Sequence, residues 1–513
     1  MLISSRQGSG VDDVPGTLGG RRARKNSLTA KSLITLAAMG VAALAGISVV
    51  SCSGQDLPTG VTLRSIDGGT DYFSKINPRS AWMDQHILLG AWLEQPLNGT
   101  EVGYDRAADD NIYWNLAGSP VPTAACGGSP CRADYNVIRH GGLHVSAPDT
   151  TANSGSETVA YEGSDESDMQ YGAGWGKWNK KYNDTVGAWN SCNPPQDEHG
   201  QCGYTVAKWY YSGAPTSLGS PDYPTADTVK HQGYGKGVLF WETTADAAKF
   251  MAFSDILSAD SYWMSDPALN APSQGGCALF PKSPVICKDY SGSGLTDAQR
   301  ALPANYEYNV TKLEQLQALT GPPKPVIVDV ETGCPGSSGN CTTPPAMTAA
   351  AWHALIAGAR GILWFQHNFG GPCIDSRTII DGSNPASGKY NCQQTPGVTL
   401  HDMVVALTRF NKEVTSLNTV LLAPFADHYV TAKGDVSCMA KYSNGVYYVF
   451  AGSGRPGEPP RPGQQVTFQL AGAPSTSVTV LDEHRTLRVV HGKFTDTFAN
   501  ADTVHIYRVG PAT

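Results

Sequence analysis

The sequence predicts a (β/α)8 barrel followed by an all-β sandwich, and three observations lead to this prediction. Apolar, strand-like runs alternate with longer and partly helical stretches through residues 83–412. From residue 419 onward the pattern changes to an alternation of apolar and polar residues. The chain has 513 residues, which is too long for one ordinary core. We therefore expect a barrel over 83–412 and a sandwich over 413–513.

Eight apolar runs are the expected barrel strands, and several lead into helical patterns, such as 244–253 and the Ala- and Leu-rich 347–359. Strands that alternate with helices indicate parallel βαβ units. A doubly wound open sheet is the alternative, but no Gly-rich phosphate loop follows the first run. Residues 171–235 show little periodicity and are interpreted as an insertion after the fourth strand. The eight runs are 87–93, 111–116, 143–147, 158–164, 237–241, 256–262, 326–330 and 361–366.

The C-terminal part shows the period of two that is typical of half-buried strands. Val436, Cys438, Ala440 and Tyr442 alternate with polar neighbours, and Asn444-Gly445 predicts a tight hairpin turn. Similar alternation recurs to the end of the chain, which predicts a sandwich of at least six strands.

The N-terminal segment has the pattern of an export signal. A basic stretch at 21–31 precedes an apolar run at 33–50. We therefore expect residues 1–51 to be an export signal and residues 52–82 to be a linker. Val49-Val50-Ser51-Cys52 resembles the lipobox of bacterial lipoproteins, which implies lipidation of Cys52. An uncleaved membrane anchor and cleaved secretion are the alternatives. We thus expect an extracytoplasmic protein, held at a membrane or secreted.

The cysteines agree with export, because short-range disulfides persist only in an oxidising compartment. Pairing by neighbour is the simplest arrangement, and spacing alone does not determine connectivity. No CxxC pair suggests zinc, and we expect no metal or cofactor. Cys438, in a strand pattern, is expected to be a buried free thiol. The expected pairs are Cys126 with Cys131, Cys192 with Cys202, Cys277 with Cys287, Cys334 with Cys341, and Cys373 with Cys392.

Composition narrows the class of ligand. The formal net charge of −8 argues against nucleic acid as a partner. Charged residues make up 16% of the chain, whereas Trp (11) and Tyr (22) are plentiful. This combination favours neutral, ring-shaped ligands over phosphates, and we expect a monomer that acts on carbohydrate.

Active sites of (β/α)8 barrels lie at the carboxyl ends of the strands. Those ends are rich in carboxylates and aromatic rings, and Lys and Arg are almost absent there. Paired carboxylates are what glycoside hydrolysis requires, and aromatic faces stack on sugar rings. The residues expected to bind substrate are Trp92, Glu94, Trp114, His144, Asp165, Trp241, Asp260, Tyr262, Trp263, Asp329, Trp364 and His367.

Several motifs, in order along the chain, resemble those of the (β/α)8 retaining glycoside hydrolases. The segment 161–168 (YEGSDESD) resembles the fourth-strand motif, and 324–333 (KPVIVDVETG) resembles the seventh. The resemblance implies that Glu166 is the acid/base and Glu331 the nucleophile. Ser167 stands where the family motif often has Pro, and the Asn-Glu pair of many members is absent. Glu242 is the alternative acid/base.

The spacing of the seventh run supports this role for Glu331. Ile327, Asp329 and Glu331 share one face of a strand, so Asp329 and Glu331 are expected in the barrel mouth, with Glu331 ionised at neutral pH. Neighbouring acids are expected to raise the pKa of Glu166. Other readings stay open: Glu331 could only position other groups, and Glu166 could be a solvated surface acid. The alternatives in function are a non-catalytic glycan-binding lipoprotein on a decayed barrel and an envelope structural protein.

Overall fold

The structure is a computed structural model, and it describes residues 57–92, 96–114, 135–148, 155–165, 225–228, 255–259, 261–265, 296–318, 321–334, 341–473 and 476–510. The expected signal 1–51 and Cys52 lie outside these residues. Within the described part of the chain, every helix is too short or too polar to span a bilayer.

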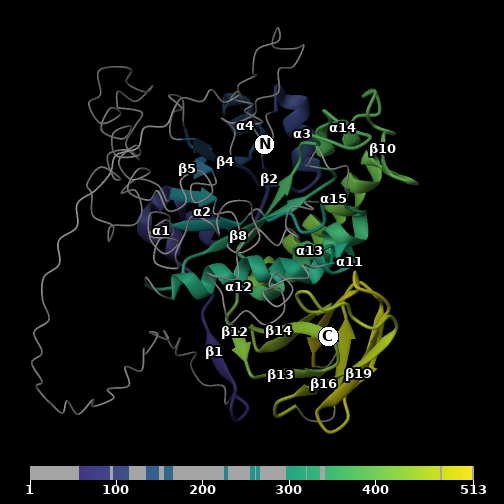
Figure 1. Ribbon diagram of the computed structural model, residues 1–513. Coiled ribbons are helices and arrows are strands. Elements are labelled where there is room, and N and C mark those ends of the chain that lie inside the picture. Colours follow the sequence, from purple (N-terminus) through teal and green to yellow (C-terminus); the bar gives the residue numbers. More distant parts are fainter. Residues whose placement is uncertain are drawn as a thin grey trace, which may run out of the picture. The chain divides into compact units, whose positions relative to one another are not determined.

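Eight parallel strands close into a barrel in chain order, from β2 to β9 (Figure 1). The ring closes where β9 pairs with β2, from Leu88 opposite Gly361 to Trp92 opposite Phe365. This confirms the predicted (β/α)8 architecture. The strands are β2 (Leu88–Trp92), β3 (Ile112–Trp114), β4 (His144–Pro148), β5 (Thr158–Asp165), β6 (Thr225–Thr228), β7 (Ile256–Ala259), β8 (Val326–Glu331) and β9 (Gly361–Phe365).

Seven of the eight strands coincide with predicted runs, and the fifth does not. The strand between β5 and β7 is β6, which pairs with both neighbours and falls inside the expected insertion 171–235. The predicted strand 237–241 lies outside the described residues. The sequence of β6 is Thr-Ala-Asp-Thr, which has no apolar run and therefore gives no strand signal.

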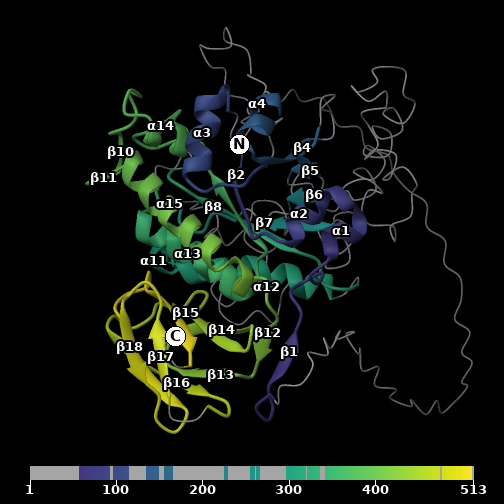
Figure 2. The ribbon, with the colours of Figure 1, turned by 180° about the vertical axis from the view of Figure 1, so that it is seen from behind.

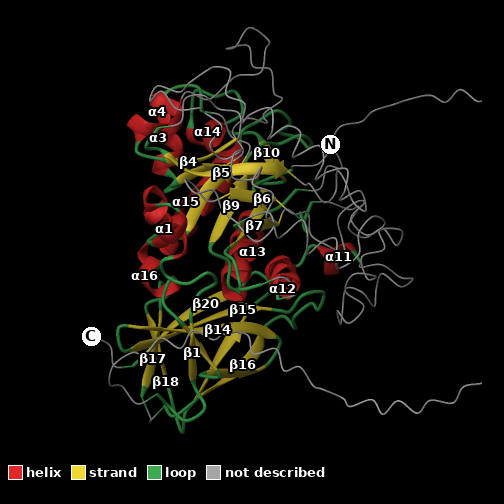
Figure 3. Ribbon diagram, turned by 90° about the vertical axis from the view of Figure 1, so that its left-hand side faces the viewer, coloured by secondary structure: helices red, strands yellow, loops and turns green. Residues whose placement is uncertain are grey.

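Helices surround the barrel strands, as Figures 2 and 3 show. The helix predicted at 347–359 is α13, and nine of its 14 residues are buried, because it is apolar on all sides. Pro344 begins this helix, where the missing backbone N–H does no harm. The helices are α3 (Gly99–Ala107), α4 (Tyr135–Gly141), α11 (Asp297–Arg300), α12 (Tyr306–Gln317), α13 (Pro344–Ala357), α14 (Thr378–Ser383), α15 (Leu400–Ser416) and α16 (Asn418–Leu421).

Side chains of the barrel strands divide between two cores. Val326, Val328 and Val330 pack with the surrounding helices. Ile327, from the same strand, belongs to the cluster inside the ring, which also contains Leu363. The alternation predicted for β8 is therefore confirmed, and the inward face continues through Asp329 to Glu331.

The C-terminal part is a sandwich of two antiparallel sheets, as predicted. One sheet has the order β1-β12-β14-β15-β20-β17-β18, and the other has the order β13-β16-β19. The hairpin at Asn444 and Gly445 has φ values of 49° and 82°, as a tight turn requires. The strands are β12 (Phe425–Asp427), β13 (Val430–Lys433), β14 (Val436–Ser443), β15 (Val446–Ser453), β16 (Gln464–Leu470), β17 (Ser477–Val480), β18 (Arg485–Arg488), β19 (Lys493–Phe498) and β20 (Val504–Val509).

The segment expected to be a linker has secondary structure. Its strand β1 (Thr62–Arg64) pairs with β12, so the first strand of the sandwich precedes the barrel in the chain. Helices α1 (Tyr72–Ile76) and α2 (Ala81–Asp84) follow. They place Phe73 and Met83 against the interior cluster of the barrel. These elements are too short to give a periodic signal, which is why the sequence pattern missed them.

Buried ionic groups connect the barrel with the sandwich. Lys441 of β14 is 2% exposed. Its Nζ lies 3.3 Å from the ring centroid of Phe425 and donates to the carbonyl of Ala423. Burial lowers the pKa of Lys441 well below its usual value, and the charges of Arg64 and Arg360 act in the same direction. This amine is therefore held in a site that disfavours its charge.

We predict that Lys441→Met reduces the pH dependence of stability. The folded chain loses this proton at a lower pH than the unfolded chain, which holds it up to about pH 10.4, so the free energy of unfolding of the wild type should rise with pH between these two points. Denaturant unfolding at a series of pH values measures the slope. Lys433→Met, at an exposed position of β13, is the control. An unchanged slope in Lys441→Met would show that the buried amine is charged.

Candidate functional site

Three aromatic side chains meet at the carboxyl ends of the barrel strands. Trp92 ends β2 and Phe365 ends β9, and their rings stack with centroids 4.8 Å apart. Tyr262, which follows β7, meets Phe365 edge to face at 5.1 Å. Trp92 and Tyr262 were predicted as site residues. Phe365 was not, although its alternation with Trp364 places it on the inward face.

Glu331 ends β8 on the same face and is completely buried. Its Oε1 accepts hydrogen bonds from the backbone N–H groups of Met264 and Ser265, at 2.9 and 3.1 Å. The hydroxyl of Tyr306, the first residue of α12, donates to Oε2. The loop after β7 and the start of α12 therefore fix the carboxylate from two sides. Sequence patterns gave no sign of Tyr306, because helix α12 precedes β8 and only the fold turns its first residue toward Glu331.

The environment of Glu331 changes its ionisation. Burial raises its pKa to about 7, and the hydrogen bonds from Met264 and Ser265 oppose this rise. Burial thus shifts Glu331 toward its protonated form, whereas the sequence analysis expected an ionised carboxylate at neutral pH. Such a carboxyl can change protonation state near neutral pH, as acid–base groups of active sites do.

Asp329 lies one layer deeper on the inward face. It is fully buried, and its Oδ2 accepts a hydrogen bond of 2.8 Å from the hydroxyl of Ser258 on β7. Two carboxylates of β8 thus face the inside of the barrel, as the alternation predicted. The depth of Asp329 suits it to support the site rather than to contact a ligand.

Two tryptophans that were predicted to bind substrate lie instead between the barrel strands and the helices. Trp364 and Trp263 are fully buried. Their indole N–H groups donate to Asn411 of α15 and Asn309 of α12. Neither ring can stack on a sugar, and both assignments are corrected to core residues. The reason for Trp364 is that strand alternation turns it outward.

His144 and Trp114 also differ from expectation. His144 is the first residue of β4 and pairs with Ile112, the first residue of β3, so it lies at the end of the barrel opposite the mouth. There its ring lies over Trp82 of α2, at 3.9 Å, and burial lowers its pKa. Trp114 faces the interior cluster and is fully buried, so it is also core.

His367 lies just beyond β9, near the aromatic rings. It is 3% exposed, and its ring centroid is 4.2 Å from that of Phe369. Burial lowers its pKa to about 4. It is therefore neutral at physiological pH and can serve as a hydrogen-bonding group but not as a cation.

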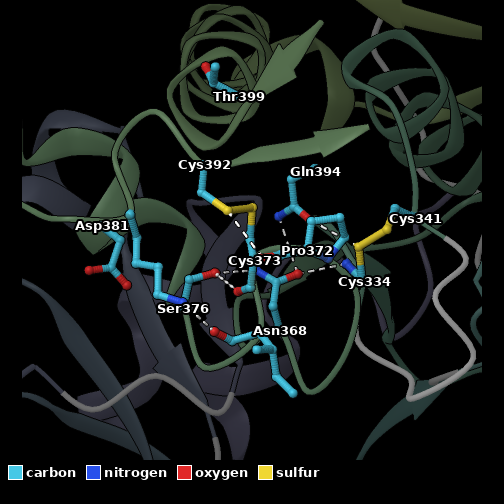
Figure 4. The surroundings of a disulfide bond; sticks show 12 residues. Cys334, Cys341, Asn368, Pro372, Cys373, Ser376, Asp381, Cys392, Gln394 and Thr399 are labelled. Atoms are coloured by element: carbon cyan, nitrogen blue, oxygen red, sulfur yellow. Dashed lines mark hydrogen bonds between the residues drawn. A yellow bond between two sulfur atoms is a disulfide. The ribbon is translucent and has the colours of Figure 1, made fainter. Parts of the chain in front are cut away.

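Two predicted disulfides are confirmed beside these residues, Cys334–Cys341 and Cys373–Cys392 (Figure 4). Asn368 joins them, since its Oδ1 accepts from the backbone N–H of Cys334 and from the side chain of Gln394. The same side chain donates to Ser376 and Thr378. Each disulfide closes a loop within one segment, Cys334–Cys341 after β8 and Cys373–Cys392 after β9, and the hydrogen bonds of Asn368 connect the two segments.

The other three predicted disulfides stay predictions, because all six of their cysteines lie outside the described residues. The first joins Cys126 and Cys131, in the segment between β3 and α4. The second joins Cys192 and Cys202, between β5 and β6, and the third joins Cys277 and Cys287, between β7 and α11. Their connectivity still rests on proximity along the chain alone.

Cys438 is a free thiol, as predicted, but it is partly exposed. Burial raises its pKa to about 11, so the thiol is protonated at neutral pH. In the described part of the chain, no cluster of His, Cys, Asp and Glu is suited to hold a metal ion.

Several predicted site residues also lie outside the described structure. They include Glu166, whose distance from Glu331 is the central quantity of the predicted mechanism. The backbone of Asp165 is described as the end of β5, but its side chain is not. The others are Glu94, Trp241, Glu242 and Asp260.

No protein-family model matches the chain, and no curated protein matches it in sequence. Several solved structures that resemble it are glycoside hydrolases. A family 39 glycoside hydrolase from Bacteroides cellulosilyticus is 11% identical over 83% of this chain and 81% of that one, with a TM-score of 0.39. A GH30 endoxylanase from Clostridium papyrosolvens is 13% identical over 83% and 96%, with a TM-score of 0.34. An alpha-amylase from Geobacillus thermoleovorans is 9% identical over 84% and 99%, with a TM-score of 0.36. The likeness at these scores carries no conclusion about the reaction, and the assignment of the fold rests on the strand order of the chain itself.

Proposed function

We propose that the protein is an exported glycoside hydrolase that cleaves an extracellular poly- or oligosaccharide with two carboxylates. The observation that carries the proposal is the carboxylate of Glu331, held by three donors at the carboxyl end of β8. It lies at the same end of the barrel as the rings of Trp92, Tyr262 and Phe365. Tyr262 is the partly exposed ring of the three, since Trp92 and Phe365 are only 5% and 6% exposed, and an accessible aromatic face can stack on the apolar face of a sugar.

In the proposed reaction, Glu331 in its ionised form attacks the anomeric carbon while Glu166 protonates the leaving glycosidic oxygen. The sugar is then bound to Glu331 as an ester. Glu166, now ionised, removes a proton from water, which attacks the same carbon and releases Glu331. Retention requires the two carboxyl groups to lie about 5 Å apart. The N–H groups of Met264 and Ser265 would hold Glu331 in one orientation through both steps.

An extracytoplasmic location is supported by the disulfides Cys334–Cys341 and Cys373–Cys392, since such bonds are rare in reducing compartments. Attachment to a membrane through a lipid on Cys52 is part of the same proposal. It rests on the resemblance of residues 49–52 to a lipobox.

A second function, glycan binding without cleavage, is favoured by one observation. Glu331 is completely buried, and both of its oxygens already accept hydrogen bonds. A carboxylate fixed in this way can stabilise a barrel without reaching a substrate. The two functions differ in product release, because a binding protein would be retained on a glycan that it leaves intact.

We predict that Glu331→Gln and Glu166→Gln each reduce hydrolysis by about 10²–10⁴-fold, the usual contribution of such groups. The assay is product release from a panel of polysaccharides and nitrophenyl glycosides. Glu458→Gln, which changes an exposed acid in the sandwich, is the control. Glu242→Gln tests the alternative acid/base. Full activity of both Glu331→Gln and Glu166→Gln on a glycan that the wild type cleaves would refute the mechanism. Binding without any product from the wild type would favour the second function.

The ionisation of Glu331 also predicts how stability depends on pH. Its pKa is about 7 in the folded chain and near 4.5 in the unfolded chain. The folded state therefore holds the extra proton between these values, and stability should fall as pH rises through this window, by up to about 3 kcal/mol. Glu331→Gln, which keeps an acceptor for Met264 and Ser265, should lose this dependence. Tyr306→Phe should extend the window to higher pH, because it removes a donor to the ionised carboxylate. Denaturant unfolding from pH 4 to 8 measures both effects, and parallel curves for the wild type and Glu331→Gln would contradict the raised pKa.

A further inference from the structure

A groove of about 480 Å³ lies between helices α13 and α15 and the edge of the sandwich. It follows one face of α15 from Asp402 to Glu413, 11 residues apart, which is about 16 Å at the helical rise. A span of that length accommodates about five residues of an extended chain. Among the described residues, none of those proposed for glycan hydrolysis lines this groove.

The base of the groove is apolar and has no accessible aromatic face. Trp352 and Phe410 line it but are only 5% and 2% exposed. Val405, at its edge, is 54% exposed and is one of only three large hydrophobic side chains so exposed among the described residues. A surface of this kind suits aliphatic groups. It is poorly suited to sugars, which bind on exposed ring faces.

The charge of the groove is negative. Glu413, Asp482 and Asp502 line it, and within the described structure none of them forms an ion pair. Glu483 also lines it but forms an ion pair with Arg485. Asp402 is engaged in capping α15, and Arg409 is the one basic residue among the described residues of the lining. The groove therefore has an excess of carboxylates for which the chain supplies few cations.

Glu413 and Asp482 form the centre of this negative surface. Burial raises the pKa of Glu413 to about 8, and its hydrogen bond to the carboxyl of Asp482 and the charge of Glu483 add to the rise, while Arg409 opposes it. Its surroundings thus favour the protonated form of Glu413. A cation placed between the two carboxyl groups would replace that proton and remove the repulsion.

We propose that this groove docks an extended, lysine-bearing segment of another protein. The lysine ammonium would lie between Glu413 and Asp482, and its aliphatic stem and the neighbouring side chains would cover Val405 and Ala406. Lysine fits the site because it combines a compact charge with an apolar stem. The proposal goes beyond glycan hydrolysis and does not depend on it.

The test uses the intact protein and a synthetic peptide of alternating Lys and Leu, with a Glu–Leu peptide of the same length as its counterpart. Isothermal titration should detect binding of the Lys peptide alone. Glu413→Gln, Asp482→Asn and Val405→Glu should each weaken binding or change its charge dependence, the first two by roughly tenfold. Asn tolerates the positive φ of Asp482, 58°, and Val405 is exposed, so the folds of these variants should be retained. Glu458→Gln is the charge-matched control outside the groove.

Proton release gives an independent readout. At pH 7, binding of the Lys peptide should release a proton from Glu413, seen as a dependence of the binding heat on the ionisation enthalpy of the buffer. Glu413→Gln should abolish that dependence. Equal binding of both peptides, or binding unaffected by all three variants, would overturn the proposal. Concentration-dependent dimerisation that Val405→Glu abolishes would overturn it in favour of a second copy as the occupant. A peptide spanning residues 20–35 could also bind more tightly than the Lys peptide, and a protein lacking those residues could bind it more tightly than the full chain does. Together, these two results would assign the groove to the protein's own basic segment.

Discussion

The closure of eight parallel strands into a ring commits each strand residue to one of two environments. On β8, Val326, Val328 and Val330 pack under the helices, while Ile327, Asp329 and Glu331 face inward. The same rule on β9 turns Trp364 outward to Asn411 and Phe365 inward to Trp92. Which residues can reach a substrate is therefore decided by alternation within a closed sheet, before any property of the individual side chain matters.

The inward carboxylates are maintained by donors that the surrounding elements supply. An isolated buried charge is costly, and such a group takes up a proton unless hydrogen bonds compensate it. For Glu331 the compensation comes from Met264, Ser265 and Tyr306 and is partial, which leaves its pKa near neutral. The same balance that holds the carboxylate in place therefore makes its charge responsive to pH. A fully solvated glutamate at the same position would have neither property.

Buried basic side chains lie where the barrel and the sandwich meet, and they are as unusual as the buried carboxylate of Glu331. Strand β1 precedes the barrel in sequence yet pairs with β12 of the sandwich. The chain therefore contributes one strand to the sandwich, then forms the barrel, and then forms the remaining strands of the sandwich. Lys441 and Arg360 are almost completely buried. Lys441 lies in the sandwich and Arg360 lies just before β9 of the barrel, so these side chains are buried only when both parts of the chain are folded together. The sandwich is accordingly part of one folded unit with the barrel, and the groove beside α15 exists only because the two meet.

The alternation of strands and helices, the change to period two and the inward face of β8 could be predicted from the sequence, because they depend on residues close together in the chain. Pairing of neighbouring cysteines was the simplest arrangement, and the structure established two of these pairs. The sequence did not reveal β6, whose four residues lack an apolar run, or the short elements before the barrel. Tertiary structure alone decided that His144 lies at the far end of the barrel and that Trp263 and Trp364 are core. It also placed Tyr306 against Glu331 and buried that carboxyl group, which raises its pKa. The physical reason is that burial, and with it ionisation, depends on which distant segments cover a side chain, and local sequence patterns carry no record of that.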